Sequence, residues 1–291
     1  MAKSNKLKSR ADMLAGIILL VVSLGLIVSI FVAMKQCTAQ LPVPTQRPTT
    51  VTTVAPTQPP EPTLVPNPLE SDGFRYDENG YLTCLTAESW LGVDVSVHQG
   101  KIDWQQVAKT DVQFAMVRLA YRGWGAEGVI CADSRGLENL DGAADAGLKV
   151  GAYFFSQATS VEEAVEEARF LLDLLDGRKL DMPIVFDWEN VAAADARTAH
   201  VTREMVTACA LAFCREIEAA GYEAMVYYYL ALETWKLDLL QIQQAGYGFW
   251  LAMYSDTLRY AHKVQMWQYA NNGAVPGIAT KVDMNLYFPG N

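Results

Sequence analysis

The sequence predicts a mixed α/β fold, in which one transmembrane helix and a disordered linker precede an irregular TIM-like barrel. The barrel is predicted from two observations after residue 90. Eight apolar runs of strand length alternate with helical patterns, which favours a parallel sheet closed on itself. Helical patterns follow only the first five runs, so we expect five β/α units and then three strands, with an antiparallel or loosely closed end. The runs are Leu91–Val97, Gln113–Tyr121, Lys149–Ser156, Pro183–Glu189, Glu223–Tyr229, Gly248–Tyr254, Val264–Tyr269 and Thr280–Leu286.

Residues 13–34 form an uncharged, apolar segment of 22 residues, which predicts the transmembrane helix. At about 1.5 Å per residue, such a helix crosses a hydrocarbon core of roughly 30 Å. Basic residues precede it, so we expect residues 1–12 to be a cytoplasmic tail and the rest of the chain to lie outside the cell. The alternative is a signal peptide cleaved near Cys37-Thr38-Ala39, which would give a secreted protein, although such apolar regions usually have only about 7–15 residues. The basic residues are Lys3, Lys6, Lys8 and Arg10.

Residues 35–69 are predicted to be a Pro/Thr-rich linker. Residues 42–68 contain nine of the twelve prolines and seven threonines. This composition cannot bury enough apolar surface to fold, so we expect an extended, semi-rigid spacer. Residues 70–90, with turn signals at 77–80, are expected to form a lead-in segment packed on the barrel, and residues 91–291 the barrel itself.

Two helices of the barrel have clear sequence signals. Val161–Leu175 has apolar residues at helical spacing after a Thr159-Ser160 cap, with four glutamates predicted on the opposite face. Thr202–Ala220 ends at Gly221, a residue typical of helix C-termini. The four glutamates are Glu162, Glu163, Glu166 and Glu167.

Charge and cysteine content exclude several function classes. From Leu69 onward the chain has 17 Lys and Arg against 31 Asp and Glu, a balance of −14, which argues against a nucleic-acid partner. The five cysteines are an odd number without CxxC spacing, and small buried side chains are a better interpretation of them than metal ligands. No spacing typical of three metal ligands occurs, so we expect neither a metal nor a cofactor.

Four acidic residues lie within or at the ends of predicted strands. Asp94 is in the first strand, Asp187 and Glu189 end the fourth, and Asp283 is in the eighth. Asp187 and Glu189 are two residues apart, so both side chains point to the same face. Two converging carboxylates cannot both ionise cheaply, which yields a general acid beside an anionic partner, the pair that glycoside hydrolysis requires. A single acidic residue of this kind is more often a salt-bridge or loop-end residue, but four at one barrel mouth indicate catalysis.

Aromatic and amide side chains in the same strands are candidates for sugar binding. Aromatic rings suit the apolar CH faces of sugars. Strand alternation favours Tyr153, Tyr227 and Trp250 as inward-facing, although a register error of one residue would reverse this. We also assign Trp188 and Gln268 to substrate binding. The alternative for the aromatic residues is packing in the barrel core.

Together these segments closely resemble glycoside hydrolase family 25, the Chalaropsis-type lysozymes or N-acetylmuramidases. The resemblance extends from about Leu91 to Phe288, with the segments in the family's order and at its normal spacing, and it implies a barrel of five β/α units followed by three strands. The matching segments are Gly92-Val93-Asp94-Val95-Ser96, Ile102-Asp103-Trp104, Ala146–Phe155, Phe186-Asp187-Trp188-Glu189, Trp250-Leu251-Ala252, Gln265–Tyr269 and Val282-Asp283-Met284-Asn285.

The resemblance also implies an activity. It is hydrolysis of the β-1,4 bond between N-acetylmuramic acid and N-acetylglucosamine in bacterial peptidoglycan, by a catalytic domain that we expect to be monomeric. Glu189 matches the general acid, Asp187 the residue that stabilises the developing charge, and Asp94 and Asp283 the other acidic positions. A non-catalytic peptidoglycan-binding module on the same barrel, or another glycosidase such as a chitin-cleaving one, are the alternatives.

Overall fold

The structure is a computed structural model that describes residues 62–193 and 195–291. The predicted cytoplasmic tail, the anchor at 13–34 and most of the linker lie outside the described residues. Within the described part of the chain, no helix combines the length and the apolar character needed to cross a membrane.

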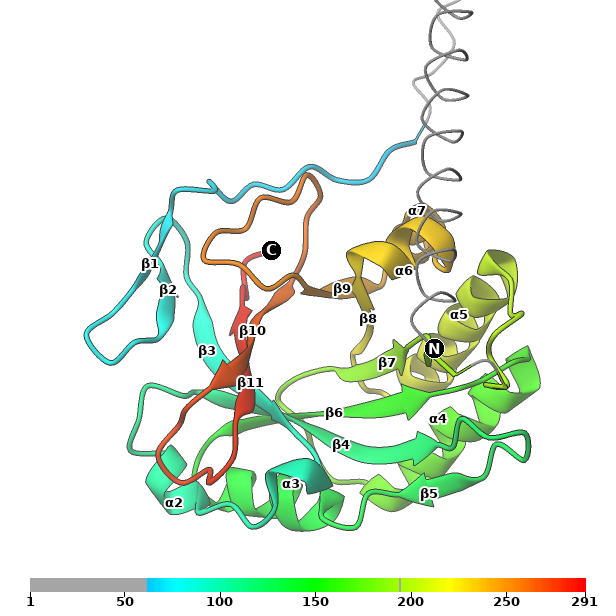
Figure 1. Ribbon diagram of the computed structural model, residues 1–291, viewed down its shortest axis with the longest axis horizontal. Coiled ribbons are helices and arrows are strands. Elements are labelled where there is room, and N and C mark those ends of the chain that lie inside the picture. The colour runs from blue at the N-terminus through cyan, green and yellow to red at the C-terminus, as the bar shows by residue number, and fades with distance from the viewer. Residues whose placement is uncertain (1–61, 194) are drawn as a thin grey trace, which may run out of the picture. The chain divides into compact units, whose positions relative to one another are not determined.

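Eight strands close into a barrel, which confirms the predicted α/β class (Figure 1). Around the barrel the order is β3-β4-β6-β7-β8-β9-β10-β11, and β11 returns to β3. All neighbouring pairs are parallel except those of β11, which is antiparallel to both β10 and β3. The antiparallel end that the sequence predicted is therefore this last strand. The strands are β3 (Trp90–Val95), β4 (Phe114–Arg122), β6 (Lys149–Ser156), β7 (Ile184–Trp188), β8 (Ala224–Tyr229), β9 (Gly248–Ala252), β10 (Met266–Gly273) and β11 (Val282–Tyr287).

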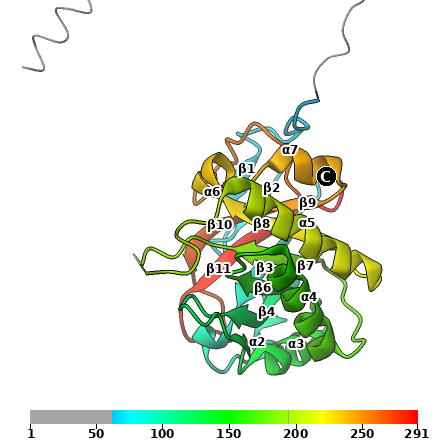
Figure 2. The same cartoon turned by 90° about the vertical axis from the view of Figure 1, so that its right-hand side faces the viewer.

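Helices follow the first five barrel strands, as predicted, and lie outside the barrel. Helices α4 and α5 pack side by side against the strands (Figure 2). Among the described residues, no helix lies between β9 and β10 or between β10 and β11. The helical elements are the 3-10 turn η1 (Val97–Gln99), α2 (Trp104–Val107), α3 (Gly136–Asp145), α4 (Val161–Leu175), α5 (Arg203–Ala219), α6 (Leu230–Trp235) and α7 (Leu239–Gln244).

Helix α4 forms over the range that the sequence predicts, with one correction to its faces. The Ser160 side chain caps it by accepting a hydrogen bond from the Glu163 amide, and Asp176 ends it in the left-handed region at φ 47°. Glu167 was predicted on the solvent face, but it is fully buried. The buried guanidinium of Arg122 accounts for this, because it lies 2.7 Å from the Glu167 carboxylate and neutralises its charge.

The apolar core has two layers, one on each side of the barrel wall. The inner layer fills the barrel with large side chains such as Phe114, Met116, Met225 and Met266. The outer layer lies between the strands and the helices and includes Phe154, Phe186 and Phe213. Because side chains alternate along a strand, each barrel strand contributes to both layers.

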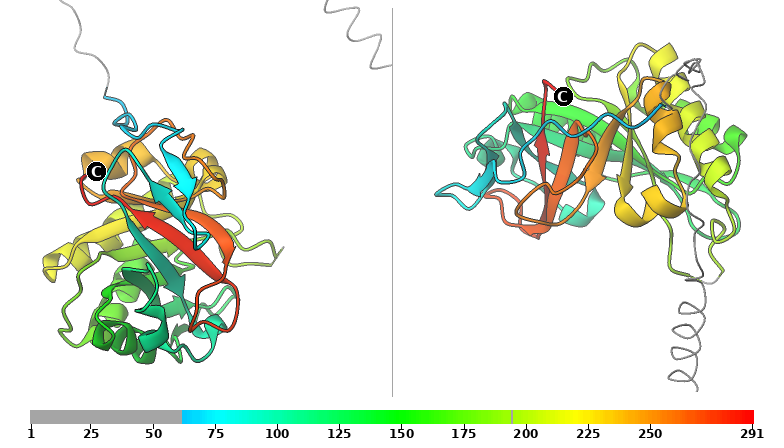
Figure 3. Two further views of the ribbon diagram at one scale, coloured as in Figure 1. Left: turned by 90° about the vertical axis from the view of Figure 1, so that its left-hand side faces the viewer. Right: turned by 90° about the horizontal axis from the view of Figure 1, so that it is seen from above.

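Three short strands were not predicted from the sequence. The hairpin of β1 (Phe74–Tyr76) and β2 (Leu82–Cys84) lies beside β10 and β11, with Phe74 packed edge-on against Trp267 at a centroid distance of 5.2 Å (Figure 3). Strand β5 (Ile130–Ala132) extends the sheet outside β4. Segments of three residues carry too little periodicity to be recognised.

The described end of the predicted linker also contacts the barrel. The Asn67 amide donates to the Ala261 carbonyl at 2.9 Å, and Pro66 forms an isolated bridge with His262. Contacts with the barrel therefore begin before residue 70, the predicted start of the lead-in segment.

Candidate active site

The structure brings all four predicted carboxylates into one pocket at the C-terminal ends of the parallel strands. Asp94 comes from β3, Asp187 and Glu189 from the end of β7, and Asp283 from the beginning of β11. Because β11 runs in the opposite direction, its first residues meet the last residues of its neighbours. The pocket has a volume of about 230 Å³. Its lining comprises Asp94, Ser96, His98, Gln99, Arg118, Tyr153, Phe155, Asp187, Glu189, Tyr227, Trp250, Tyr254, Gln268 and Asp283.

Asp94 and Asp283 lie directly opposite each other on the paired strands β3 and β11. Burial, and then the charge of Asp283, raise the pKa of Asp94 to about 8. Two amide donors oppose this rise, because Gln268 Nε2 and Asn285 Nδ2 each donate to Asp94 Oδ2 at 2.8 Å. Like charges at a cross-strand pair repel, so a proton shared between the two carboxyls is the stable arrangement.

Asp187 is buried, and its Oδ1 makes no hydrogen bond with any described residue. Burial raises the pKa of Asp187 well above its usual value, with smaller contributions from the charges of Glu189 and Asp94, whereas the Arg118 guanidinium lowers it. Such an orphaned buried oxygen has a desolvation cost that a ligand donor would remove.

Glu189 is the more exposed member of the pair on β7. Its pKa is raised to about 7, first by burial and then by the charge of Asp283. A carboxyl that keeps its proton near neutral pH can act as a general acid.

The predicted substrate-binding residues divide into two groups. Tyr153, Tyr227 and Trp250 line the pocket, as alternation predicted, and so does Gln268. The three aromatic side chains are at most 9% exposed and pack edge-to-face, at centroid distances of 6.0 Å for Tyr153 with Trp250 and 5.1 Å for Tyr227 with Trp250. They therefore form the floor of the pocket, and their ring faces are not open platforms for a sugar.

Trp188 lies outside the pocket, contrary to the prediction. Its side chain is 1% exposed in the outer core layer, and its Nε1 donates to the Ala158 carbonyl at 3.0 Å. The physical reason is strand alternation: if Asp187 and Glu189 point inward, the residue between them points outward.

Sequence reasoning missed several polar residues of the pocket, and Arg118 and Tyr254 are two of them. Arg118 lies among the carboxylates, and its Nε contacts Asp133 Oδ2 at 2.9 Å. The Tyr254 hydroxyl, just beyond β9, donates to Gln268 Oε1 at 3.2 Å. A cation in the middle of the predicted apolar run Gln113–Tyr121 is the same kind of signal that identified Asp94 in β3, and it would have found Arg118.

Residues 62–193 and 195–291 contain no group of three His, Cys, Asp or Glu side chains arranged to hold a metal ion. The pocket at the mouth of this α/β barrel contains carboxyl groups that hold protons. Acid-assisted cleavage of a glycosidic bond requires such groups. The fold and the site thus define a glycoside hydrolase.

The comparisons with known proteins identify the family. The sequence profile described as Glycosyl hydrolases family 25 matches residues 93–278, which is more than half of the chain. The chain belongs to this family.

Individual relatives are more distant. The chain is 28% identical to the uncharacterised protein YegX of Escherichia coli over 214 residues, covering 67% of this chain and 68% of YegX. It is 24% identical over 200 residues to the autolytic lysozyme of Clostridium acetobutylicum, covering 68% of this chain but only 56% of that enzyme.

Solved structures share the fold. The autolysin LytC of Streptococcus pneumoniae, determined in complex with a synthetic peptidoglycan ligand, has a TM-score of 0.62 at 22% identity, covering 74% of this chain and 50% of LytC. A family 25 glycosyl hydrolase from Bacillus anthracis has a TM-score of 0.56 at 24% identity, covering 69% of this chain and 89% of that one.

Proposed function

We propose that this glycoside hydrolase is an N-acetylmuramidase that cleaves the β-1,4 bond between N-acetylmuramic acid and N-acetylglucosamine in bacterial peptidoglycan. The single observation that carries the proposal is the convergence of Asp94, Asp187, Glu189 and Asp283 on one pocket. Family membership and the names of the relatives, which include an autolytic lysozyme and an autolysin with a peptidoglycan ligand, support this substrate class.

In this proposal Glu189 is the general acid. It is the carboxyl with a pKa of about 7 that is open enough to reach a ligand, so it holds a proton near neutral pH. Donation of that proton to the glycosidic oxygen makes the leaving sugar a neutral alcohol and breaks its bond to the anomeric carbon.

Asp187 stabilises the positive charge that develops at the anomeric centre. Its buried Oδ1 can also accept a hydrogen bond from the N–H of the acetamido group of the substrate, which orients that group towards the reacting carbon. A water molecule then adds to the anomeric carbon and loses a proton, which returns to Glu189. Asp94 and Asp283 hold one proton between them and so keep the negative charge in the pocket low.

We further propose that the enzyme is an anchored cell-wall hydrolase. Residues 13–34 would hold it in the cell membrane with the N-terminus in the cytoplasm, and the Pro/Thr-rich segment would place the barrel outside, within reach of the wall. Sucrose-gradient fractionation of cells that express the full chain tests this, with protease added to intact protoplasts. Recovery of the barrel in the culture medium instead would show that the segment is cleaved.

The activity is tested by digesting defined peptidoglycan with the full chain in detergent and analysing the products by mass spectrometry. A muramidase leaves N-acetylmuramic acid at the new reducing ends. The variant Glu189→Gln should lower kcat by about 10²- to 10⁴-fold, the usual range for a general acid. Glu70→Gln, an exposed glutamate outside the barrel strands, is the matched control and should keep full activity.

Three outcomes would contradict parts of the proposal. Binding of peptidoglycan without product would favour the non-catalytic binding module. N-acetylglucosamine at the reducing ends would indicate another glycosidase. Full activity of Glu189→Gln would remove the acid role from Glu189.

A further inference from the structure

Glu189 is the first residue after strand β7, beyond the last residues that pair with the neighbouring strands. The last residue of β7 in register with β6 is Trp188, and the last in register with β8 is Asp187. Among the described residues, no helix or strand follows until Arg203. The main chain of the proposed general acid must therefore be fixed by something other than the sheet ladder.

A buried glutamine supplies that contact. Gln157, the first residue after β6, is 0% exposed, and its Nε2 donates to the main-chain carbonyl of Glu189 at 2.7 Å. Its Nε2 also donates to the Ser156 carbonyl at 2.9 Å, and its Oε1 accepts from the Thr198 hydroxyl at 3.1 Å. Carbonyl oxygens only accept, whereas a hydroxyl can donate, so the amide can satisfy all three partners in this orientation alone.

The neighbouring residues repeat the arrangement. Trp188 Nε1 donates to the Ala158 carbonyl at 3.0 Å, so the last residue of β7 and the residue after it are bound by two consecutive residues of the turn after β6. Two polar contacts on one turn fix both the position and the direction of the chain as it leaves the strand.

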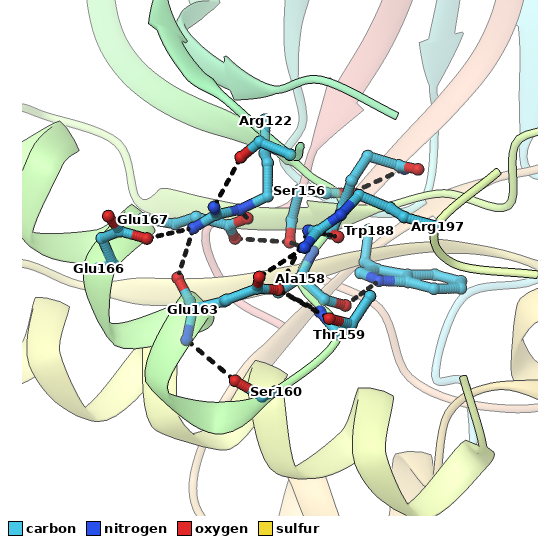
Figure 4. Close-up of polar contacts among 12 residues, drawn as sticks. Arg122, Ser156, Ala158, Thr159, Ser160, Glu163, Glu166, Glu167, Trp188 and Arg197 are labelled. Atoms are coloured by element: carbon cyan, nitrogen blue, oxygen red, sulfur yellow. Dashed lines mark hydrogen bonds and ion pairs between the residues drawn. The ribbon is translucent and has the colours of Figure 1, made fainter. Parts of the chain in front are cut away.

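Charged side chains also contact the turn, as Figure 4 shows. The Ser156 hydroxyl donates to the buried carboxylate of Glu167 at 2.6 Å, and Arg122 Nε donates to the same carboxylate at 2.7 Å. Arg197 donates to the main-chain carbonyl of Gln157 at 2.7 Å and forms an ion pair with Glu163 on α4. Buried charge-assisted hydrogen bonds of this kind are stronger and more directional than neutral ones.

We propose that Gln157 is a positioning residue for catalysis: through the Glu189 carbonyl it sets where the proposed general acid stands relative to Asp187 and the substrate. The inference rests on the proposed role of Glu189. Gln157 is not among the residues that line the pocket, so its effect must pass through the main chain.

The test compares variants of the full chain in kcat and KM on defined peptidoglycan fragments. Gln157→Met keeps the size of the side chain and removes the donor, and we expect kcat to fall by about 10- to 100-fold, because displacements of about 1 Å have effects of this size. KM should stay within about threefold, because the bond acts on the reacting group and not on ground-state binding.

Gln157→Glu gives a readout that a purely structural role would not change. Its neutral carboxyl can donate to the Glu189 carbonyl, but its ionised form cannot. The kcat of this variant, relative to that of the wild type at each pH, should therefore rise as pH falls, whereas the same ratio for Gln157→Met should stay flat. If Gln157→Met does not fold, the pH dependence of Gln157→Glu decides alone.

Leu171→Ala is the control for a general loss of stability. Leu171 is fully buried on α4, away from the pocket lining, so this variant should lower Tm and leave kcat unchanged. The proposal is overturned if Gln157→Met keeps wild-type kcat, or if its loss is no larger than that of Leu171→Ala. If the wild type is inactive, or if Glu189→Gln keeps full activity, the proposed function is wrong. These two measurements therefore distinguish failure of the proposed function from failure of the proposal about Gln157.

Discussion

The shared proton of Asp94 and Asp283 makes the stability of the barrel depend on pH. The change to make is Asp94→Asn, which keeps the shape of the side chain and places an N–H where the shared proton would be. The variant therefore carries permanently the donor that wild-type Asp94 has only when it is protonated. Gln268 and Asn285 can still donate to the remaining oxygen at the position of Asp94 Oδ2.

The sign and size of the effect follow from linkage. The pKa of Asp94 is about 8 in the folded protein, against the ordinary value of 3.8 that applies to the unfolded chain. Between these values the folded chain holds a proton that the unfolded chain has lost, so stability falls as pH rises through the window. One proton contributes about 1.36 kcal/mol per pH unit, which gives a ceiling of about 4 kcal/mol between pH 5 and pH 8.

Urea unfolding at pH 5, 6, 7 and 8 measures this for the full chain. We expect the free energy of unfolding of the wild type to decline more steeply with pH than that of Asp94→Asn, with the difference between the curves growing by about 2–4 kcal/mol over the range. Asp173→Asn, an exposed aspartate on α4, is the control and should run parallel to the wild type. Parallel curves for Asp94→Asn and wild type would refute the shared proton.

Three further predictions concern single side chains. In Arg118→Met we expect the acid limb of the pH–rate profile to move to higher pH, because the guanidinium lowers the pKa of Asp187. Arg118→Lys keeps the charge and should move the limb less. An unmoved limb in Arg118→Met would show that Arg118 does not affect the reacting pair. Arg122→Met should cost about 3–5 kcal/mol in urea unfolding, because it leaves the carboxylate of Glu167 buried without its cation; a loss below about 1 kcal/mol would contradict the buried pair. Trp188→Phe should lower the free energy of unfolding by about 1–3 kcal/mol, because the hydrogen bond from Nε1 to the Ala158 carbonyl is lost, and KM should stay constant. A raised KM would show that Trp188 contacts the substrate after all.

The barrel could be predicted because its strands repeat one pattern. Each strand is long enough to show apolar character, and each of the first five is followed by a helical signal, so both the number of strands and the missing late helices could be read from the sequence. Strand alternation also placed Asp187 and Glu189 on one face. Applied consistently, the same rule would have turned Trp188 outward.

The contacts that tune the site could not be predicted. Asn285 donates to Asp94 across 191 residues of sequence, and Gln157 reaches Glu189 across 32. Neither residue has a local signal, because an amide in or after a strand is compatible with solvent, core or site. Likewise the burial of Trp250 at the floor of the pocket depends on how tightly Tyr153 and Tyr227 pack around it. The periodicity of a single strand carries no information about this packing.

The pairing of β3 with β11 joins the first and last strands of the barrel, and it has a consequence for how the protein matures. Contacts so distant in sequence form late, because a long loop must close before they can contribute. Asp94 meets Asp283 and Asn285 only when β11 enters between β3 and β10. Any form of the chain in which β11 is not in place would have Asp187 and Glu189 but no completed pocket. The complete set of four carboxylates therefore requires the closed barrel, with β11 paired to both β3 and β10.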